Sequence, residues 1–277
     1  MKKNERAAAI VRTVVVSLIA VLFVVPLVWM VLSSLKTAPE VFARPFHWLP
    51  AKAQWQNYAT VWMNEEASML RAFANTLYIA LFSIVGQMLI SSLAAYSFAK
   101  INFKGKQVVF MLFLSSMMVP SQLTIIPRFM LFKTIGLYNN LWAIILPAFF
   151  GATSIFMLRQ FYMGLPNDLI EAAKIDGAGH LRIFLRIMLP LTKAALMSLI
   201  ILAFISSWNE YMAPLIFLVK KELYTVSQNI QWYMLDEFKE HNLTMAAATS
   251  AIVPVVILFI VGQKYFVEGI ATSGVKG

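Results

Sequence analysis

Long uncharged runs alternate with short polar segments along the whole chain. Five runs contain no Asp, Glu, Lys or Arg, and a sixth is interrupted only by Glu210. They cover residues 13–35, 72–99, 107–127, 134–158, 194–219 and 241–263. A helix needs about 20 apolar residues to cross the hydrocarbon core of a bilayer. Because backbone groups in lipid find no water to bond with, each spanning run must be helical. The pattern therefore predicts an all-α integral membrane protein with six transmembrane helices.

Glycine or proline interrupts most of these runs. The positions are Pro26, Gly86, Pro120, Pro147, Pro214 and Pro254. Inside a helix bundle such residues allow kinks and close helix contacts. The first run follows the basic segment MKKNERAAAIVR, which resembles the start of a signal peptide. It is longer than the roughly 7–15 residues of a signal-peptide core, so we expect a retained first span.

Composition agrees with a lipid environment. Only 13% of the 277 residues are charged and 60% are hydrophobic, whereas soluble domains carry about 25% charged residues. The three histidines, His47, His180 and His241, are scattered and give a metal site little support. Without cysteine the redox compartment cannot be inferred. The net charge of +10 is spread over many loops, which argues against nucleic-acid binding and for a role in membrane orientation.

The distribution of basic residues predicts the orientation. With the N-terminus inside, 14 of the 23 lysines and arginines fall in inside segments, and six spans bring the C-terminus to the same side. Both termini are therefore expected in the cytoplasm. We expect an N-terminal part (1–71) with an extracytoplasmic loop, whose Trp48, Trp55 and Trp62 anchor at the interface. A membrane domain (72–267) and a cytoplasmic tail (268–277) would follow.

One inside segment, between the fourth and fifth runs, is more polar than its neighbours. Residues 171–190 read EAAKIDGAGHLRIFLRIMLP. Asn167 or Asp168 can cap a first short helix that begins near Leu169, and a second helix is expected after a glycine turn. In the second helix one apolar stripe is predicted at i, i+3, i+4 and i+7, made of Leu181, Phe184, Leu185 and Met188. Pro190 should interrupt the helix before the fifth span.

This segment resembles the cytoplasmic loop signature of type I ATP-binding-cassette (ABC) importer permeases. The signature reads Glu-Ala-Ala, three residues, Gly, nine residues, Ile-x-Leu-Pro. The matching residues are Glu171, Ala172, Ala173, Asp176, Gly177, Ile187, Leu189 and Pro190. Nearly the whole chain is similar to the carbohydrate (maltose-type) branch of this family. The stretches that carry this likeness are VPSQLTIIPRF (119–129), SSWNEYMAPLIFL (206–218) and YFVEGIATSGVKG (265–277).

The resemblance implies a fold and a role. The fold would be the type I ABC importer transmembrane fold in a bacterial inner membrane. Segment 164–193 would be a coupling loop that docks into a separate ATPase, with Glu171 as a hydrogen-bond acceptor. The implied partners are a second, homologous permease, two ATPase subunits and an extracytoplasmic sugar-binding protein. This chain would perform no covalent chemistry and bind no cofactor, because ATP and Mg would be used by the partner ATPase.

Several residues allow a second interpretation. Glu171 could instead form a capping box with Asp168. Asn209, Glu210 and Tyr211 could contact sugar hydroxyls on the substrate path. Glu210 could equally fix helix packing, since a carboxylate at membrane depth must face protein or water. Gln122 and Thr124 are weaker candidates for the path, with packing as the alternative. The tail from Ser273 to Gly277 could touch the ATPase or simply fray.

Two other classes of protein fit the sequence less well. A gradient-driven transporter would need ion- or proton-carrying groups near the midplane, often in inverted repeats, and Glu210 alone is thin support. A membrane-embedded enzyme would need clustered catalytic groups, which the sequence does not suggest. The chain also lacks the phosphate-binding pattern G-x-x-x-x-G-K-[ST], so its energy must come from a partner or a gradient.

Overall fold

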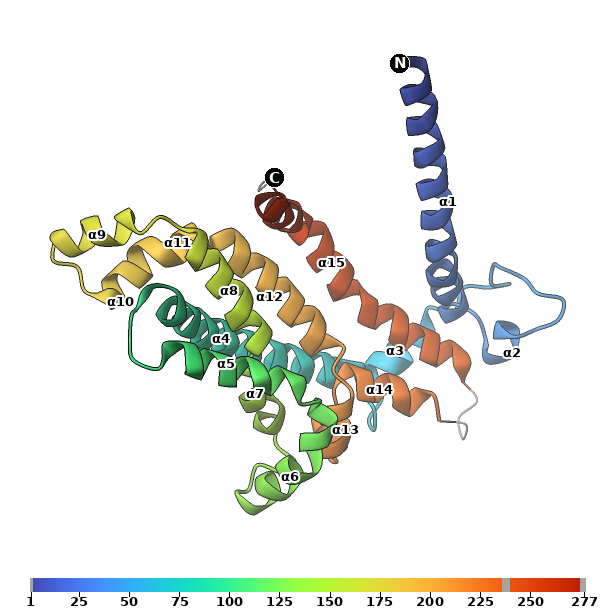
Figure 1. The fold of residues 1–277 in the computed structure, drawn as a ribbon. Helices are drawn as coiled ribbons and strands as arrows, with labels where there is room; N and C mark the ends of the chain where they lie inside the picture. Colours follow the sequence, from blue (N-terminus) through green and yellow to red (C-terminus); the bar gives the residue numbers. More distant parts are fainter. Residues whose placement is uncertain (1, 236–239, 275–277) are drawn as a thin grey trace. The chain divides into compact units, whose positions relative to one another are not determined.

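The chain is helical throughout the part that the computed structural model describes, residues 2–235 and 240–274 (Figure 1). In chain order the first helices are α1 (Lys2–Ser34), α2 (Ala38–Val41), α3 (Gln56–Met63), α4 (Met69–Lys100), α5 (Lys106–Ser115), η1 (Ser116–Met118), α6 (Ser121–Thr134), α7 (Trp142–Ala148) and α8 (Ala152–Gly164). They are followed by α9 (Asp168–Ile175), α10 (His180–Ile183), η2 (Phe184–Met188), α11 (Leu189–Leu191), α12 (Lys193–Trp208), α13 (Met212–Phe217), η3 (Lys221–Leu223), α14 (Val226–Tyr233) and α15 (His241–Gly274). Among these, η1 and η3 are 3₁₀ turns and η2 is a π-helix. The predicted all-α class is confirmed.

Four stretches of helix are long and apolar enough to cross a bilayer. They are Ala8–Ser34, Met69–Lys100, Trp142–Gly164 and His241–Gln263. Two further candidates are bent helix pairs: Lys106–Met118 with Ser121–Thr134, at 96°, and His180–Leu191 with Lys193–Trp208, at 77°. By length and composition, the described residues therefore provide the six predicted spans if each bent pair counts as one.

The run at 107–127, predicted as one helix, is broken near its middle. Val119 is extended, with φ −87° and ψ 111°, and α6 begins only after Pro120. A residue before proline is pushed out of the α region, and proline has no N–H to continue the helix. The local chemistry of one dipeptide therefore accounts for the 96° bend.

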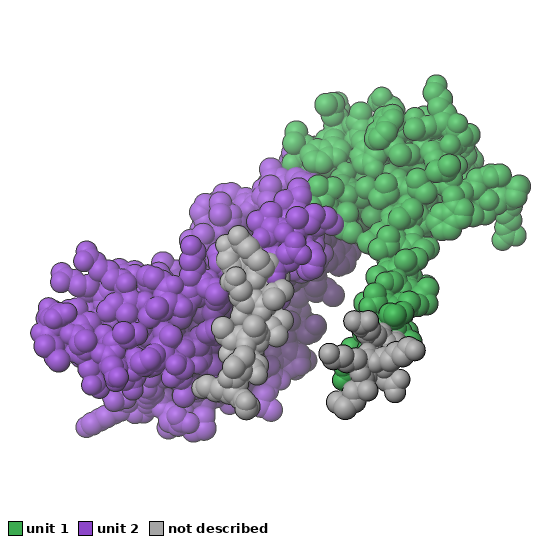
Figure 2. Space-filling model, turned by 90° about the horizontal axis from the view of Figure 1, so that it is seen from above, with its two compact units in different colours: residues 1–70, 229–253 green, residues 71–228, 254–277 purple. Residues whose placement is uncertain are grey.

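The chain divides into two compact units (Figure 2). Unit 1 consists of residues 1–70 and 229–253, and unit 2 of residues 71–228 and 254–277. Segment 229–253 joins the N-terminal residues although 158 residues separate the two in sequence. The predicted interaction of the tail from Ser273 to Gly277 concerns side chains that lie outside those the structure describes.

Unit 1 is held together by buried polar side chains that satisfy backbone groups. Asn57 donates to the carbonyl oxygens of Ser34 (2.8 Å) and Lys36 (2.9 Å) and accepts a hydrogen bond from Asn242 (3.1 Å). The Tyr233 hydroxyl donates to the Ala67 carbonyl oxygen at 3.0 Å. Burial, with a smaller effect of the Glu240 charge, raises the pKa of Tyr233 to about 12, so the hydroxyl keeps the proton that it donates.

Unit 2 contains two apolar clusters. The larger joins α4, α8 and α9 to the helices that follow, around Tyr96, Leu158, Tyr162, Ile183 and Met188. The second lies around α6, α7 and α13, with Phe132, Ile144, Ile145 and Phe217 at its centre. The larger cluster includes the 171–190 segment, so that segment is packed onto the unit rather than being a free loop.

Helix α1 has almost no protein around its apolar part. Residues 8–28 of this helix are all exposed, and the mean hydropathy of the span is 2.9. A helix that is hydrophobic on all sides requires lipid or another chain around it. This exposure agrees with the retained first span predicted from the sequence.

Candidate functional site

The 171–190 segment forms two short helices joined by a glycine turn. Figure 1 shows α9 and α10 meeting at this turn, at one end of unit 2. Gly177 has φ +76°, and the Ala178 N–H bonds the Ala173 carbonyl oxygen (2.9 Å) while the Gly177 N–H bonds that of Lys174 (3.0 Å). This pair of bonds is the Schellman ending of a helix, which favours glycine at the left-handed position. The predicted helix–turn–helix arrangement is confirmed.

Glu171 does not form the capping box that was its alternative role. Helix α9 begins at Asp168 with Asn167 as N-cap, and no side chain caps it. Glu171 is therefore one position past N3, and within the described chain its exposed carboxylate has no recorded hydrogen bond. Ala172 beside it is exposed as well, whereas Ile170 and Ala173 are buried in the larger apolar cluster. Helix α9 thus packs by one face and presents Glu171 on the other.

The exposed face of α9 and its turn is partly apolar. Ile175 is 86% exposed, and Asp176 and Gly177 next to it are exposed too. The described part of the unit therefore leaves this large aliphatic side chain uncovered, beside the charged side chain of Asp176.

The predicted apolar stripe after the turn is half wrong. Phe184 and Met188 are buried as expected, but Leu181 is 66% exposed and Leu185 51% exposed, and Ile183 is buried in their place. The positions that pack are Ile183, Phe184, Ile187 and Met188, spaced i, i+1, i+4 and i+5. This is one helical face, rotated toward Ile183 from the predicted stripe.

The end of the segment behaves as predicted at Pro190. Ile187 and Leu189 are partly buried against the larger cluster, and Pro190 lies in α11 just before the 77° bend into α12. The Thr192 hydroxyl donates to the Met188 carbonyl oxygen at 3.1 Å, which satisfies an acceptor beside the bend. Beyond this bend the chain continues directly into α12.

Two contacts connect the 164–193 loop to α4. The Lys100 ammonium, at the last residue of α4, donates to the Leu165 carbonyl oxygen (2.7 Å) and to Asn167 Oδ1 (2.7 Å). The Tyr96 hydroxyl lies 3.1 Å from His180 Nδ1 at the start of α10. Lys100 entered the sequence argument only as an inside charge, and nothing in the pattern indicated this second role.

A cavity of about 360 Å³ lies within unit 2, between α4, α6, α7, α12 and α13. It is lined by Ser83, Gln87, Ser121, Gln122, Ile125, Arg128, Ile144, Pro147, Ala148, Ala203, Ser206, Ser207, Glu210, Met212 and Ala213. Gln122 and Glu210, two of the residues predicted for the substrate path, share this cavity. Asn209 and Tyr211 are not among its lining residues, and the Asn209 amide instead donates to the Ile205 carbonyl oxygen at 2.8 Å.

The cavity contains one positive and one negative side chain. The Glu210 carboxylate accepts a hydrogen bond from the Ala213 N–H at 3.0 Å, so it caps the start of α13. The Arg128 guanidinium carbon lies 5.1 Å from the centre of the Phe217 ring, and its charge interacts electrostatically with Glu210. The sequence predicts Arg128 as a charge on the outer side, and in the structure its side chain lines the cavity after the break at Pro120.

Several polar atoms around this cavity form no hydrogen bond within the described part of the chain. They are Arg128 Nε and the hydroxyl groups of Ser83 and Ser207, all of which are buried. Buried donors of this kind normally bond to protein, water or a ligand. Gln122 adds an exposed amide, while Gln87 bonds Ser154 at 2.9 Å. The side chains of Gln122, Arg128 and Glu210 line the cavity, so it presents groups that can form hydrogen bonds with a polar solute.

Thr124 does not reach the cavity, since its hydroxyl bonds the Ser121 carbonyl oxygen at 2.9 Å. Among the described residues, no three His, Asp or Glu side chains are grouped as metal ligands. The groups of unit 2 that can bind a partner or a solute are therefore the polar and charged side chains at the cavity and at the exposed turn.

Comparison with known proteins gives consistent matches over nearly the whole chain. Residues 87–272 match the sequence model described as "Binding-protein-dependent transport system inner membrane component". The arabinooligosaccharides transport system permease protein AraQ of Bacillus subtilis (strain 168) is 33% identical over 94% of this chain and 93% of its own length. The sn-glycerol-3-phosphate transport system permease protein UgpE of Pectobacterium atrosepticum is 30% identical over 99% of both chains.

A solved structure has the same fold. It is the crystal structure of a bacterial ABC transporter involved in the import of the acidic polysaccharide alginate, and it covers 95% of this chain and 98% of its own with a TM-score of 0.83. The two chains are 24% identical, so this likeness concerns the fold.

Proposed function

We infer the function from the premise that the chain belongs to the family of binding-protein-dependent transport system inner membrane components, which its match over residues 87–272 establishes. The chain is a membrane permease subunit with the type I ABC importer fold. We propose that its transported substrate is a carbohydrate and that the cavity of unit 2 is part of the translocation path. The observation that carries the proposal is the joint presence of an exposed Glu171 helix and a polar cavity in one helical body.

The chemistry of the cavity supports a hydroxyl-rich solute. Sugar hydroxyls donate and accept, and the cavity offers an acceptor in Glu210, a donor in Arg128, and an amide in Gln122 that does both. Buried polar groups that are left unpaired weaken binding, so a solute that pairs all of them is favoured over an apolar one. The names of the relatives AraQ and the diacetylchitobiose uptake permease NgcG of Streptomyces coelicolor support the same class.

The contacts of the loop suggest how movement reaches the cavity. Through Lys100 the loop is bonded to α4, which contributes Ser83 and Gln87 to the cavity. Through the bend after Pro190 it continues into α12, which contributes Ser206 and Ser207. A displacement of α9 and α10 would therefore shift two cavity walls together. Such a displacement requires a partner that contacts the two states differently.

The partners follow from the family. We propose a second, homologous permease, two ATPase subunits that use ATP and Mg, and an extracytoplasmic sugar-binding protein. No cofactor is expected on this chain. The 164–193 loop and both termini would lie in the cytoplasm, as the distribution of basic residues favours.

The test is assembly and transport with a Glu171→Gln variant. The tagged chain, expressed with its transporter genes, should co-purify with the second permease and stoichiometric ATPase. Glutamine keeps the size of the side chain but removes the charged acceptor, and hydrogen bonds to charged groups contribute about 1.5–3 kcal/mol. We expect roughly tenfold or greater loss of ATPase retention or of ATP-driven uptake.

Glu222→Gln is the matched control, because Glu222 is exposed in η3 and far from the loop in sequence. It should behave like the wild type. Normal uptake and assembly of the Glu171→Gln variant would remove Glu171 from the coupling role. Transport by the purified chain with no companion subunit would overturn the proposed function itself.

A further inference from the structure

A buried lysine follows directly after the first membrane helix in unit 1. Lys36 lies two residues beyond the end of α1 and is only 1% exposed. Its ammonium donates to the His47 carbonyl oxygen and lies 5.2 Å from the centre of the Phe46 ring. An ammonium has three N–H donors, and neither recorded partner in the described chain is an anion. Burying such a charge is costly unless an anion compensates it.

The acid nearest in sequence is already engaged. Glu40 Oε2 accepts the Thr37 N–H at 2.9 Å, and the charge of Lys36 acts on this carboxylate only as a minor electrostatic effect. The hydrogen bonds from Thr37 lower the pKa of Glu40, so the side chain stays ionised at neutral pH. Two opposite charges thus lie near one another without forming a pair.

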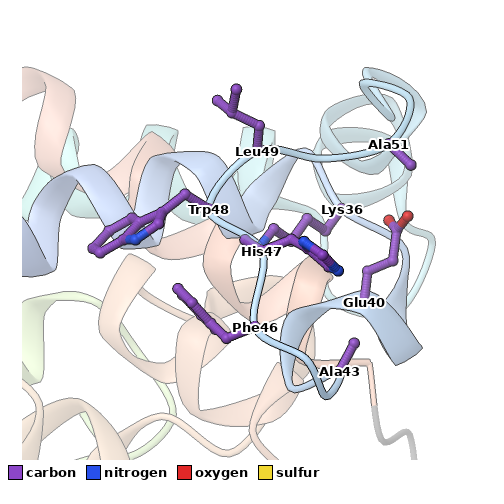
Figure 3. Close-up of a pocket in the computed structure, with 8 residues that line it drawn as sticks. All are labelled: Lys36, Glu40, Ala43, Phe46, His47, Trp48, Leu49 and Ala51. Atoms are coloured by element: carbon purple, nitrogen blue, oxygen red, sulfur yellow. The ribbon is translucent and has the colours of Figure 1, made fainter.

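A pocket of about 640 Å³ opens beside these two side chains. It is lined by Lys36, Glu40, Ala43, Phe46, His47, Trp48, Leu49 and Ala51. Figure 3 shows Lys36, His47 and Glu40 gathered on one side of the pocket, with Phe46 and Trp48 on the other. The pocket is therefore polar at one end and aromatic at the other.

An apolar groove continues from the aromatic end. It is formed by Ala20, Val21, Val24, Val25 and Val28 of α1 together with Trp48. Trp48 lines both the groove and the pocket. From Val28 to Ser34, the last residue of α1, an α-helical rise of 1.5 Å per residue gives about 9 Å. The groove therefore belongs to the apolar part of the span, and the pocket lies beyond the end of the helix. Tryptophan is enriched at this boundary in membrane proteins.

We propose that the pocket and the groove together hold one phospholipid whose headgroup carries both a phosphate and a primary ammonium, as in phosphatidylethanolamine. The phosphate lies toward Lys36, the ammonium toward Glu40, and an acyl chain follows the valines of α1 past Trp48. This is a structural lipid site on the permease, separate from the cavity of unit 2 and independent of the transported substrate.

The charges and the shape select this occupant. A free phosphate would leave the valine groove empty, and an acyl chain alone would leave the Lys36 charge uncompensated. A glycerol headgroup such as that of phosphatidylglycerol supplies the anion but has no ammonium to meet Glu40. The zwitterionic headgroup places an opposite charge beside each of these two side chains.

The experiment measures the lipid that remains bound after delipidation. The complete transporter is washed in detergent, and the retained phosphatidylethanolamine and phosphatidylglycerol are quantified by native mass spectrometry and lipid extraction. We expect about one retained phosphatidylethanolamine per chain. In a second arm, the delipidated wild-type complex is titrated with vesicles of either lipid, and phosphatidylethanolamine should rebind at a lower concentration. This arm needs no substitution.

Two variants and a matched control refine the test. Trp48→Ala removes the side chain shared by the pocket and the groove and should lose the bound lipid, whereas Trp55→Ala, on the same loop and 69% exposed, should not. Glu40→Gln can still accept the Thr37 N–H but loses its charge. The ratio of retained phosphatidylethanolamine to phosphatidylglycerol should therefore fall at least threefold.

Three results would overturn the proposal. These are equal rebinding of the two lipids by the wild type, unchanged retention in Trp48→Ala, or absence of any retained lipid because another subunit covers the pocket. None of these outcomes concerns ATP-driven uptake, so the proposed lipid site and the proposed transport function are tested independently.

Discussion

Gly177 and Gly179 lie two residues apart in the turn between α9 and α10, yet only one of them needs to be glycine. Gly177 has φ +76°, whereas Gly179 has φ −72° and ψ 162°, which any residue adopts. A Cβ at either position would meet nothing within 4 Å. The cost of Gly177→Ala is therefore purely conformational, about 1–2 kcal/mol for a left-handed alanine.

We predict that Gly177→Ala speeds amide hydrogen exchange in α9 roughly tenfold, because opening of the turn becomes easier by that free energy. Hydrogen exchange followed by mass spectrometry measures it. Gly179→Ala is the control and should leave the exchange of α9 unchanged. Equal protection in the two variants would mean that the left-handed turn does not determine the stability of α9.

Glu210 has two roles in the structure that one substitution can separate. Its carboxylate caps α13 through the Ala213 N–H and also faces Arg128 across the cavity. Glu210→Gln keeps an acceptor for the cap but removes the negative charge. If the charge contributes to sugar binding, uptake at low substrate concentration should fall about tenfold or more, since a hydrogen bond to a charged group contributes roughly 1.5–3 kcal/mol.

The measurement is initial uptake into vesicles, with assembly followed by co-purification of the ATPase. Ser206→Ala, which trims another lining residue without a charge change, is the comparison and should have a smaller effect. Unchanged uptake by Glu210→Gln would leave capping and packing as the role of this residue.

Sequence reasoning found part of this cavity and missed the rest for a definite reason. Glu210 stood out because an acid within a span is costly, and Gln122 because it lies between two prolines. Arg128 was missed because a basic residue just past an uncharged run is ordinarily a loop charge. Only the break at Pro120 brings it to the wall of the cavity.

At the level of elements, the sequence predicts the helices better than it predicts which face of a helix is buried. The 3.6-residue repeat correctly predicts a helix after Gly179 and the burial of Phe184 and Met188. It fails for Leu181 and Leu185, because the face that packs is rotated toward Ile183 and Ile187. Apolar residues lie on both faces of this segment, so packing against α4 and α8 decides which face is buried.

Lys100, at the end of α4, allows a test of how movement of the loop is coupled to α4. Lys100→Met keeps the aliphatic stem but removes the hydrogen bonds to Leu165 and Asn167. We expect ATP hydrolysis by the complex to continue while the number of solute molecules moved per ATP falls severalfold, because movement of the loop no longer displaces α4 fully.

Uptake and ATP hydrolysis are measured together in proteoliposomes. Lys104→Met is the matched control, since Lys104 is exposed in the turn after α4. It should keep the normal ratio. A normal ratio in Lys100→Met would show that α12 alone transmits the movement.

At the scale of the whole molecule, we predict the orientation of the chain in the membrane, which labelling can test. Because the chain has no cysteine, single-cysteine variants report cleanly on membrane sidedness. A membrane-impermeant maleimide should label Trp55→Cys in intact spheroplasts and Ile175→Cys only after permeabilisation. Both positions are well exposed, at 69% and 86%.

Labelling both variants after permeabilisation controls for reactivity. Labelling of Ile175→Cys in intact spheroplasts would place the 164–193 loop on the outer side. The coupling role of that loop would then be lost, since its partner ATPase works in the cytoplasm.

The sequence by itself determined the all-helical class, the six apolar runs and the family, because lipid imposes a length and a composition on every span. It also determined the helix–turn–helix of the exposed segment, since a left-handed glycine and a proline act locally. Tertiary structure alone decided that residues 229–253 group with the N-terminal 70, that Arg128 shares a cavity with Glu210, and that Lys100 fastens the loop. These depend on which distant surfaces meet in space, and a pattern of neighbouring residues cannot encode that by itself.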